Sequence, residues 1–211
     1  MNKVTERINT LKNKIGAIYS EETKRLGISG VQLVIIDDVY LPIFVRNRME
    51  PHYDFDDIDD FMDRYLDVMA SFHDNLIGTY TWGTIEDEDG YENIPDTDVV
   101  ILTSKLAELL LAADEETILE SMRIFIRHEL GHVIDEILEV NSYDTDEDFD
   151  DQHNASRELL EMHYAEWSKK VETMTEKEGL RLYYEIPEEA SANRNAGITF
   201  EDIWTAIEKL K

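Results

Sequence analysis

The sequence predicts an α+β fold in a single domain over residues 1–211. Helical patterns and short β-branched runs follow one another in the order helix, strands, helix, strands and then several helices, with no internal repeat. A length of 211 residues favours one domain over two, and a hydrophobic share of 42% is enough for one substantial core. We therefore expect a small sheet packed against several helices.

The first half of the chain is expected to supply the sheet and two helices. Apolar residues spaced three and four apart predict helices over 4–26 and 54–77. Runs rich in β-branched or aromatic residues predict strands over 31–37, 40–46, 79–85 and 98–104. Pro42 would place the second of these strands at a sheet edge or at a strand start, because proline cannot donate a ladder hydrogen bond.

The second half is expected to be helical. Apolar periodicity predicts helices over 114–138 and 156–174, with an acidic insertion at about 141–180 and a break at Gly179. Pro187 suits the first turn of a short helix. Thr199 and Asp202 are expected to cap the last helix.

Composition excludes several classes of function. Lys and Arg total 20 against 48 Asp and Glu, which gives a net charge of −28. Such a surface repels nucleic acid and anionic lipid, so we expect no direct nucleic-acid binding and no membrane partner. The acidic runs 54–63 and 144–151 are expected to be solvated, or alternatively to attract a basic protein or imitate nucleic-acid charge.

Cysteine usage and apolar runs predict a cytoplasmic protein. There is no cysteine, which excludes a disulfide framework, a thiolate zinc site and a cysteine nucleophile. The first residues contain no apolar signal segment, and no stretch of about 18 apolar residues is present.

One pentapeptide, His128-Glu129-Leu130-Gly131-His132, has the pattern HExxH. Two histidines one helical turn apart can bind the same ion, and the adjacent glutamate can deprotonate a water that the ion activates. The pattern is expected by chance roughly 0.02 times in a chain of this composition. It therefore favours a zinc site over the alternative, two histidines on a solvated helix face without a metal.

The helix that carries this motif has two distinct faces. The apolar face contains Met122, Ile126, Leu130, Val133 and Ile137. The other face contains Ser121, Phe125, His128, His132 and Asp135. The histidines are thus expected to point away from the main core and into a cleft.

A catalytic zinc site needs a third protein ligand, and two glutamates are candidates. Glu189 lies in the segment PEEASAN, where Asn193 is one turn further on and Ala192 allows a close helix approach. Glu166 lies in YAEW and has Lys170 at the corresponding position, where a cation would compete for the carboxylate. The local sequence favours Glu189, with Glu166 as the alternative.

HELGH with a downstream P-x-E-x-x-A-N-x-x-A segment resembles the small gluzincin metallopeptidases of phages and mobile elements, some of which cleave repressors. By this resemblance His128 and His132 are zinc ligands and Glu129 is the general base. Glu189 is then the third ligand, and Asn193 supports the site. HELGHVID followed by YAEW also resembles the catalytic domain of lethal-factor-type toxins, which favours Glu166 instead.

The gluzincin resemblance implies a minimal zincin fold, in which a small sheet packs on the HExxH helix and further helices follow. It also implies a Zn²⁺ cofactor and a protein or peptide substrate, and therefore a zinc-dependent endopeptidase. The alternative is an acidic, non-catalytic protein that binds a basic partner.

Several other residues have both a functional and an ordinary interpretation. Asp135 is either a hydrogen-bond acceptor for a ligand histidine or one of many surface acids. Tyr183, Tyr184 and His163 are either oxyanion stabilisers or packing residues. The strand 98–104 is either a sheet edge that aligns a substrate or an ordinary core strand.

Overall fold

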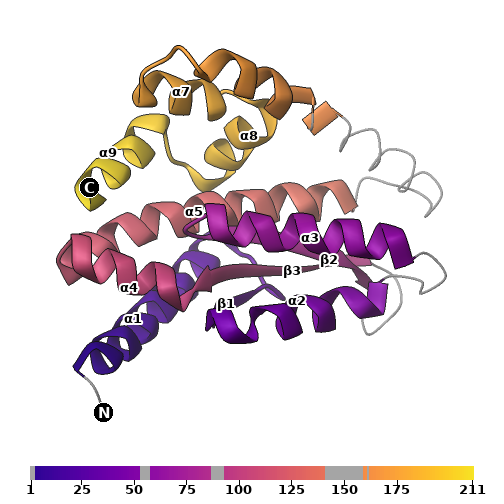
Figure 1. Cartoon of the computed structure of the whole chain (residues 1–211), viewed down its shortest axis with the longest axis horizontal. Helices are drawn as coiled ribbons and strands as arrows, with labels where there is room; N and C mark the ends of the chain where they lie inside the picture. The colour runs from indigo at the N-terminus through magenta and orange to yellow at the C-terminus, as the bar shows by residue number, and fades with distance from the viewer. Residues whose placement is uncertain (1–2, 53–57, 87–92, 141–158, 161) are drawn as a thin grey trace.

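The computed structural model describes residues 3–52, 58–86, 93–140, 159–160 and 162–211 (Figure 1). Its regular elements are α1 (Lys3–Leu26), β1 (Gln32–Ile36), α2 (Leu41–Met49), α3 (Ile58–Asp74), β2 (Gly78–Glu86), β3 (Asn93–Leu102), α4 (Thr103–Ala112), α5 (Glu115–Val140), a helical segment 162–171, α7 (Glu176–Tyr183), α8 (Pro187–Ala196) and α9 (Phe200–Leu210). Short 3₁₀ helices, Asp38–Tyr40 and Glu50–His52, flank α2. The predicted α+β class is confirmed, with helices dominating a small mixed sheet.

The sheet has the strand order β1-β3-β2 within the described residues. β1 pairs in parallel with β3, from Gln32 opposite Asp98 to Ile36 opposite Leu102. β2 pairs with β3 in the antiparallel direction. β3 is therefore the central strand, with both of its edges already paired. Of the two interpretations of the strand 98–104, the core strand holds, and the sheet edge is wrong.

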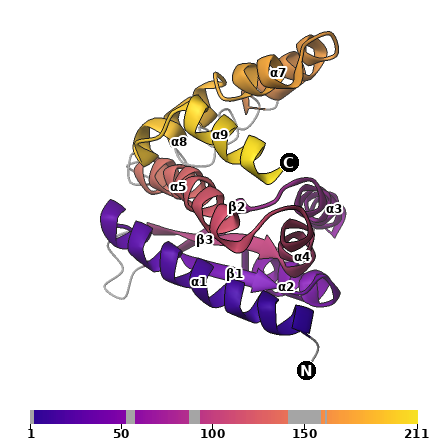
Figure 2. The same cartoon turned by 90° about the vertical axis from the view of Figure 1, so that its left-hand side faces the viewer.

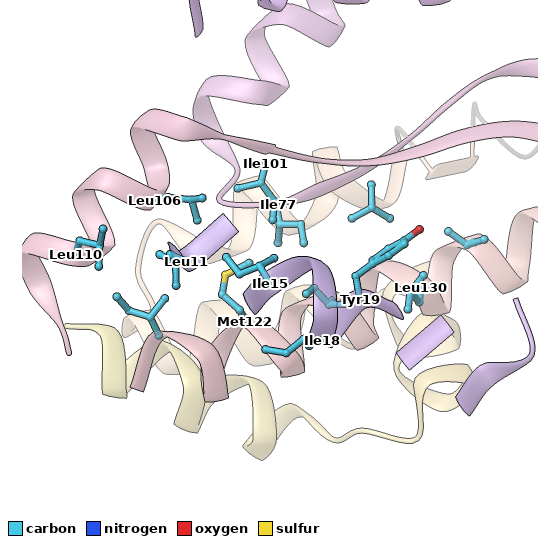
Figure 3. Packing of buried hydrophobic residues seen from close by; sticks show 14 residues of the cluster. Leu11, Ile15, Ile18, Tyr19, Ile77, Ile101, Leu106, Leu110, Met122 and Leu130 are labelled. Carbon is cyan, nitrogen blue, oxygen red and sulfur yellow. The ribbon is translucent and has the colours of Figure 1, made fainter. Parts of the chain in front are cut away.

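Both faces of the sheet are covered by helices. Val99 and Ile101 of β3 pack with α1, α4 and α5, whereas Val100 and Leu102 pack with α2 and α3. Figure 3 shows the first of these clusters, where Ile15 of α1 and Met122 of α5 meet Ile101. A strand buried on both faces needs a continuous apolar run, which explains the sequence VVIL at this position.

α5 lies between the sheet and the C-terminal helices (Figure 2). Its predicted apolar face is buried in the core, against one face of the sheet. Its other face is covered by α8 and α9, and Phe125 there packs with Ile198 and Ile203. The histidines of the HExxH motif lie on this second face, as the spacing predicts.

Two predictions about secondary structure are wrong. Residues 40–46 are helical rather than a strand: Tyr40 ends the first 3₁₀ helix, and residues 41–46 belong to α2. Pro42 lies in the first turn of α2, whose Leu41, Val45 and Met49 share one buried face. Gly179 lies inside α7 rather than at a break, where its small size lets Val171 pack closely.

Other boundaries agree more closely with expectation. Thr199 and Asp202 form the predicted capping box of α9, and α8 begins at Pro187. The acidic run 144–151 lies outside the described residues, as does the start of the run 54–63. α4 was not foreseen as a separate helix.

No helix in the described part of the chain combines the length and apolarity needed to cross a membrane.

Candidate metal centre

Three side chains from two helices meet between α5 and α8. α5 supplies His128 and His132, and the first turn of α8 supplies Glu189. Among the described residues, these three form the one group of histidines and carboxylates that could hold a metal ion. Their distances are 3.0 Å from His128 Nε2 to Glu189 Oε2, 3.5 Å from His132 Nε2 to the same oxygen, and 3.3 Å between the two Nε2 atoms.

These distances match the size of a zinc site. Zinc binds imidazole nitrogen and carboxylate oxygen at about 2.0–2.2 Å, so two ligand atoms of a tetrahedral site lie roughly 3.3–3.5 Å apart. The three atoms therefore resemble one face of a coordination tetrahedron. His128 and Glu189 are buried, but the side chain of His132 is 25% exposed, which leaves an approach from solvent on its side.

The tautomer of His128 suits a metal ligand. Its Nδ1 lies 3.0 Å from the Oδ1 atom of Asn193, and an amide oxygen can only accept, so Nδ1–H is the donor. The Nε2 atom of His128 then carries a lone pair in the neutral ring, and this atom faces Glu189 Oε2 and His132 Nε2. Asn193 is itself buried, as a residue that orients a ligand histidine should be.

Glu189 Oε2 is buried and makes no hydrogen bond of acceptable geometry with the described residues, although it lies next to both imidazoles. A buried carboxylate oxygen without a donor is destabilising unless a cation is nearby. Burial alone would raise the pKa of Glu189, but the two histidines hold it well below its usual range. Burial opposes protonation of His132, yet contact with Glu189 and its charge outweigh burial and raise the pKa of His132 to about 9.

Glu129 is held beside this group by the edge strand β2. The hydroxyl of Thr79 lies 3.0 Å from both the Glu129 main-chain oxygen and its Oε2 atom. Burial raises the pKa of the Glu129 carboxyl, while the charges of His128 and His132 act in the opposite direction. Glu129 is thus a buried base whose proton affinity is higher than that of an exposed glutamate.

Contact between α5 and α8 brings the ligands together. A Cβ atom at Gly131 would overlap the carbonyl oxygen of Ala192, so only glycine permits this approach. Asp135 Oδ1 accepts hydrogen bonds from Ser191 Oγ at 2.8 Å and from Asn195 Nδ2 at 2.7 Å. Asp135 therefore fastens α8 to α5 rather than orienting a histidine.

The structure separates the two candidate third ligands. Glu189 lies with the histidines, whereas the side chain of Glu166 is 60% exposed and lies 3.6 Å from Lys170. The ring of Tyr184 stands edge-on to His128, and His163 contacts Glu188. Tyr183 donates a hydrogen bond to Glu189, and so does Tyr164, a residue not predicted to belong to the site. Tyr164 is the first residue of the YAEW segment, but no spacing in the sequence marks it as a partner of Glu189, which lies 25 residues further along the chain.

Fold and site together define an α+β protein with a largely buried His₂Glu cluster next to a buried glutamate. Comparison with protein-family models, with curated proteins and with solved structures finds no match. The resemblance to gluzincins therefore remains a prediction that depends on the two motifs. The residues themselves fit a zinc ion, since two imidazoles and one carboxylate are a common ligand set for catalytic zinc.

Proposed function

We propose that this protein is a zinc-dependent endopeptidase of the gluzincin type. The observation that carries the proposal is the convergence of His128 Nε2, His132 Nε2 and the unpartnered Glu189 Oε2 at 3.0–3.5 Å. Bound zinc would supply the positive charge that makes a water molecule acidic near neutral pH and polarises the substrate carbonyl. The protein residues supply the ligands, the base and the exclusion of bulk water.

Glu129 is the proton carrier in this proposal. Its carboxylate accepts the proton of the attacking water and delivers it to the amine that leaves. Thr79 restricts the carboxylate to one orientation through its hydroxyl. Burial raises the pKa of Glu129 above its ordinary value, which favours uptake of a proton by this carboxylate.

The edge strand β2 offers a place for an extended substrate. β2 carries Thr79, which touches Glu129, and within the described residues one edge of β2 pairs with β3. An extended peptide that adds to its other edge would be aligned by main-chain hydrogen bonds beside the base. In this proposal β2, rather than the strand 98–104, aligns the substrate.

The alternative, an acidic protein that binds a basic partner without chemistry, accounts for the charge of −28 but not for the site. A protein of that kind has no need of a buried carboxylate oxygen that faces the Nε2 atoms of two histidines and receives no hydrogen bond from another described residue. Nor does it need Glu129 buried against Thr79 next to two histidines. These two features favour the peptidase.

Metal analysis and a cleavage assay test the proposal together. We expect the purified protein to contain about one zinc per chain and to cleave members of a mixed peptide library, as detected by mass spectrometry of new N-termini. Removal of zinc with a chelator should stop cleavage, and added zinc should restore it.

Variants define what would contradict the proposal. His128→Ala should lose the zinc, whereas the Lys209→Ala variant, which changes an exposed ion pair on α9, should keep it. A protein that takes up no zinc would refute the metal site and favour the acidic interaction protein. Stoichiometric iron instead of zinc would refute the peptidase.

A further inference from the structure

The two oxygens of Glu189 have different surroundings. Oε1 accepts a hydrogen bond from the Tyr164 hydroxyl at 2.7 Å and another from the Tyr183 hydroxyl at 2.8 Å. Oε2 receives no hydrogen bond from the described residues and faces the Nε2 atoms of the two histidines. One carboxylate oxygen is therefore saturated with hydroxyl donors, and the other faces the two imidazoles.

We infer that Tyr164 and Tyr183 are positioning residues that make Glu189 bind metal through Oε2 alone. The inference depends on the proposed zinc site. A carboxylate oxygen accepts about two hydrogen bonds in its plane, so both acceptor positions of Oε1 are occupied. Binding metal through Oε1 as well would take the acceptor from at least one of these half-buried tyrosine hydroxyls.

Binding through one oxygen limits the number of coordination positions that Glu189 occupies around the ion. A glutamate that binds through both oxygens uses two positions around the ion, and one that binds through a single oxygen uses one. With His128 and His132 as the other ligands, single-oxygen binding by Glu189 leaves a fourth tetrahedral position for water. The two hydroxyls thus keep open the position that hydrolysis requires.

Ring packing holds the hydroxyls in place before any ion binds. The rings of Tyr164 and Tyr183 are stacked with centroids 5.7 Å apart, and Trp167 stands edge-on to Tyr183 at 5.4 Å. Trp167 in turn donates from Nε1 to the Gly179 carbonyl oxygen at 2.8 Å. The helical segment 162–171 and α7 are therefore joined at the point where both reach Glu189.

Tyrosine-to-phenylalanine variants test the inference because they keep the rings and remove the hydroxyls. The variants are Tyr164→Phe, Tyr183→Phe and the double variant. Tyr65→Phe is the control, since it also removes one hydroxyl from a stacked tyrosine but lies in α3, where its ring stacks on Phe61. Zinc affinity is measured by competition with a chromophoric chelator, and coordination by the visible spectrum of the Co²⁺-substituted protein.

Each single variant should bind zinc about 10–100-fold more weakly, as is typical when a residue that orients a ligand is lost. The Co²⁺ spectrum of the double variant should change from the intense bands of a four-coordinate ion to the weaker bands of a five-coordinate one. The control should keep both the affinity and the spectrum. A role confined to packing or stability would leave the Co²⁺ spectrum unchanged.

The outcomes separate this inference from the proposed function. If the wild-type protein binds neither zinc nor Co²⁺, the proposed site itself is wrong. If the wild type binds both and the double variant retains wild-type affinity and spectrum, only the positioning role is wrong. Should the double variant fail to fold, as judged by circular dichroism, the single variants decide, and unchanged zinc affinity in both overturns the inference.

Discussion

Gly131 and Ala192 bring the backbones of α5 and α8 into contact at the level of the metal ligands. A Cβ atom at Gly131 would come within 2.7 Å of the Ala192 carbonyl carbon, closer than ordinary packing allows. Gly131 lies one residue before His132, and Ala192 lies one residue before Asn193. The approach of the two helices therefore sets the distance from both histidines to Glu189.

Gly131→Ala should push α8 away from α5. We expect a net destabilisation of about 1–3 kcal/mol, because the backbone overlap outweighs the better helix propensity of alanine, and at least a tenfold loss of zinc affinity. Gly16→Ala is the control, since nothing lies within 4 Å of its added Cβ in α1. That change should stabilise the protein by about 0.4–1 kcal/mol and leave zinc binding intact. Urea unfolding and chelator competition measure both effects.

Glu189→Ala should weaken zinc binding by more than 100-fold, because it removes a ligand rather than a residue that orients one. Glu166→Ala should change the affinity little, since its side chain is exposed and lies next to Lys170. The comparison is made by isothermal titration with zinc. The reverse ranking would assign the ligand role to Glu166, as the resemblance to lethal-factor-type toxins predicts.

Glu129→Gln should retain one zinc per chain and lose peptide hydrolysis by a factor of about 10²–10⁴. The amide keeps the shape of the side chain and can still accept the Thr79 hydrogen bond, but it cannot accept a proton. Zinc content and cleavage rate are measured on the same preparation. Cleavage at the wild-type rate would show that Glu129 is not the base.

Asn193→Ala should reduce zinc affinity about 10–100-fold without removing a ligand. The substitution takes away the acceptor for His128 Nδ1–H, so the ring loses its fixed tautomer and orientation. Asn193→Asp supplies another acceptor and should come closer to the wild type. Equal affinity in Asn193→Ala and wild type would contradict the orienting role.

Glu22, a buried residue outside the metal site, should make the stability of the protein depend on pH. It is buried between Arg25, Arg123 and Arg127 and joins α1 to α5. Burial would raise its pKa, but the hydrogen bonds from the three arginines outweigh burial and lower the pKa of Glu22 to about 2. Because the folded-state pKa lies below the unfolded value, this stabilisation is complete above about pH 4.5 and is lost as the pH falls towards 2.

Glu22→Gln isolates that contribution. At pH 7 the variant should be less stable than the wild type by on the order of 3 kcal/mol, and the difference should shrink below about pH 4.5. Urea unfolding of both proteins between pH 3 and pH 7 measures it, and the comparison cancels the contributions of the other acids. A difference that does not vary with pH would mean that the charge of Glu22 is not the stabilising feature.

Features that depend on neighbours within one or two helical turns could be predicted from the sequence alone. The spacing in α5 separated its core face from its histidine face, and Thr199 and Asp202 predicted the start of α9. The same local logic failed at residues 40–46, where an apolar run fits a strand as well as a buried helix. Periodicity alone does not separate the two when the run is short.

The local sequence favoured Glu189 as the third ligand, but the side chains that surround it follow only from the packing of distant segments. His128 and Asn193 are 65 residues apart in the sequence, and Tyr164 reaches Glu189 from a third segment. Such contacts depend on how closely α8 approaches α5 at Gly131 and on where the segment 162–171 packs. Local spacing fixes the face on which a side chain lies, but its partner across the interface is chosen by the packing of whole helices, which no single stretch of sequence encodes.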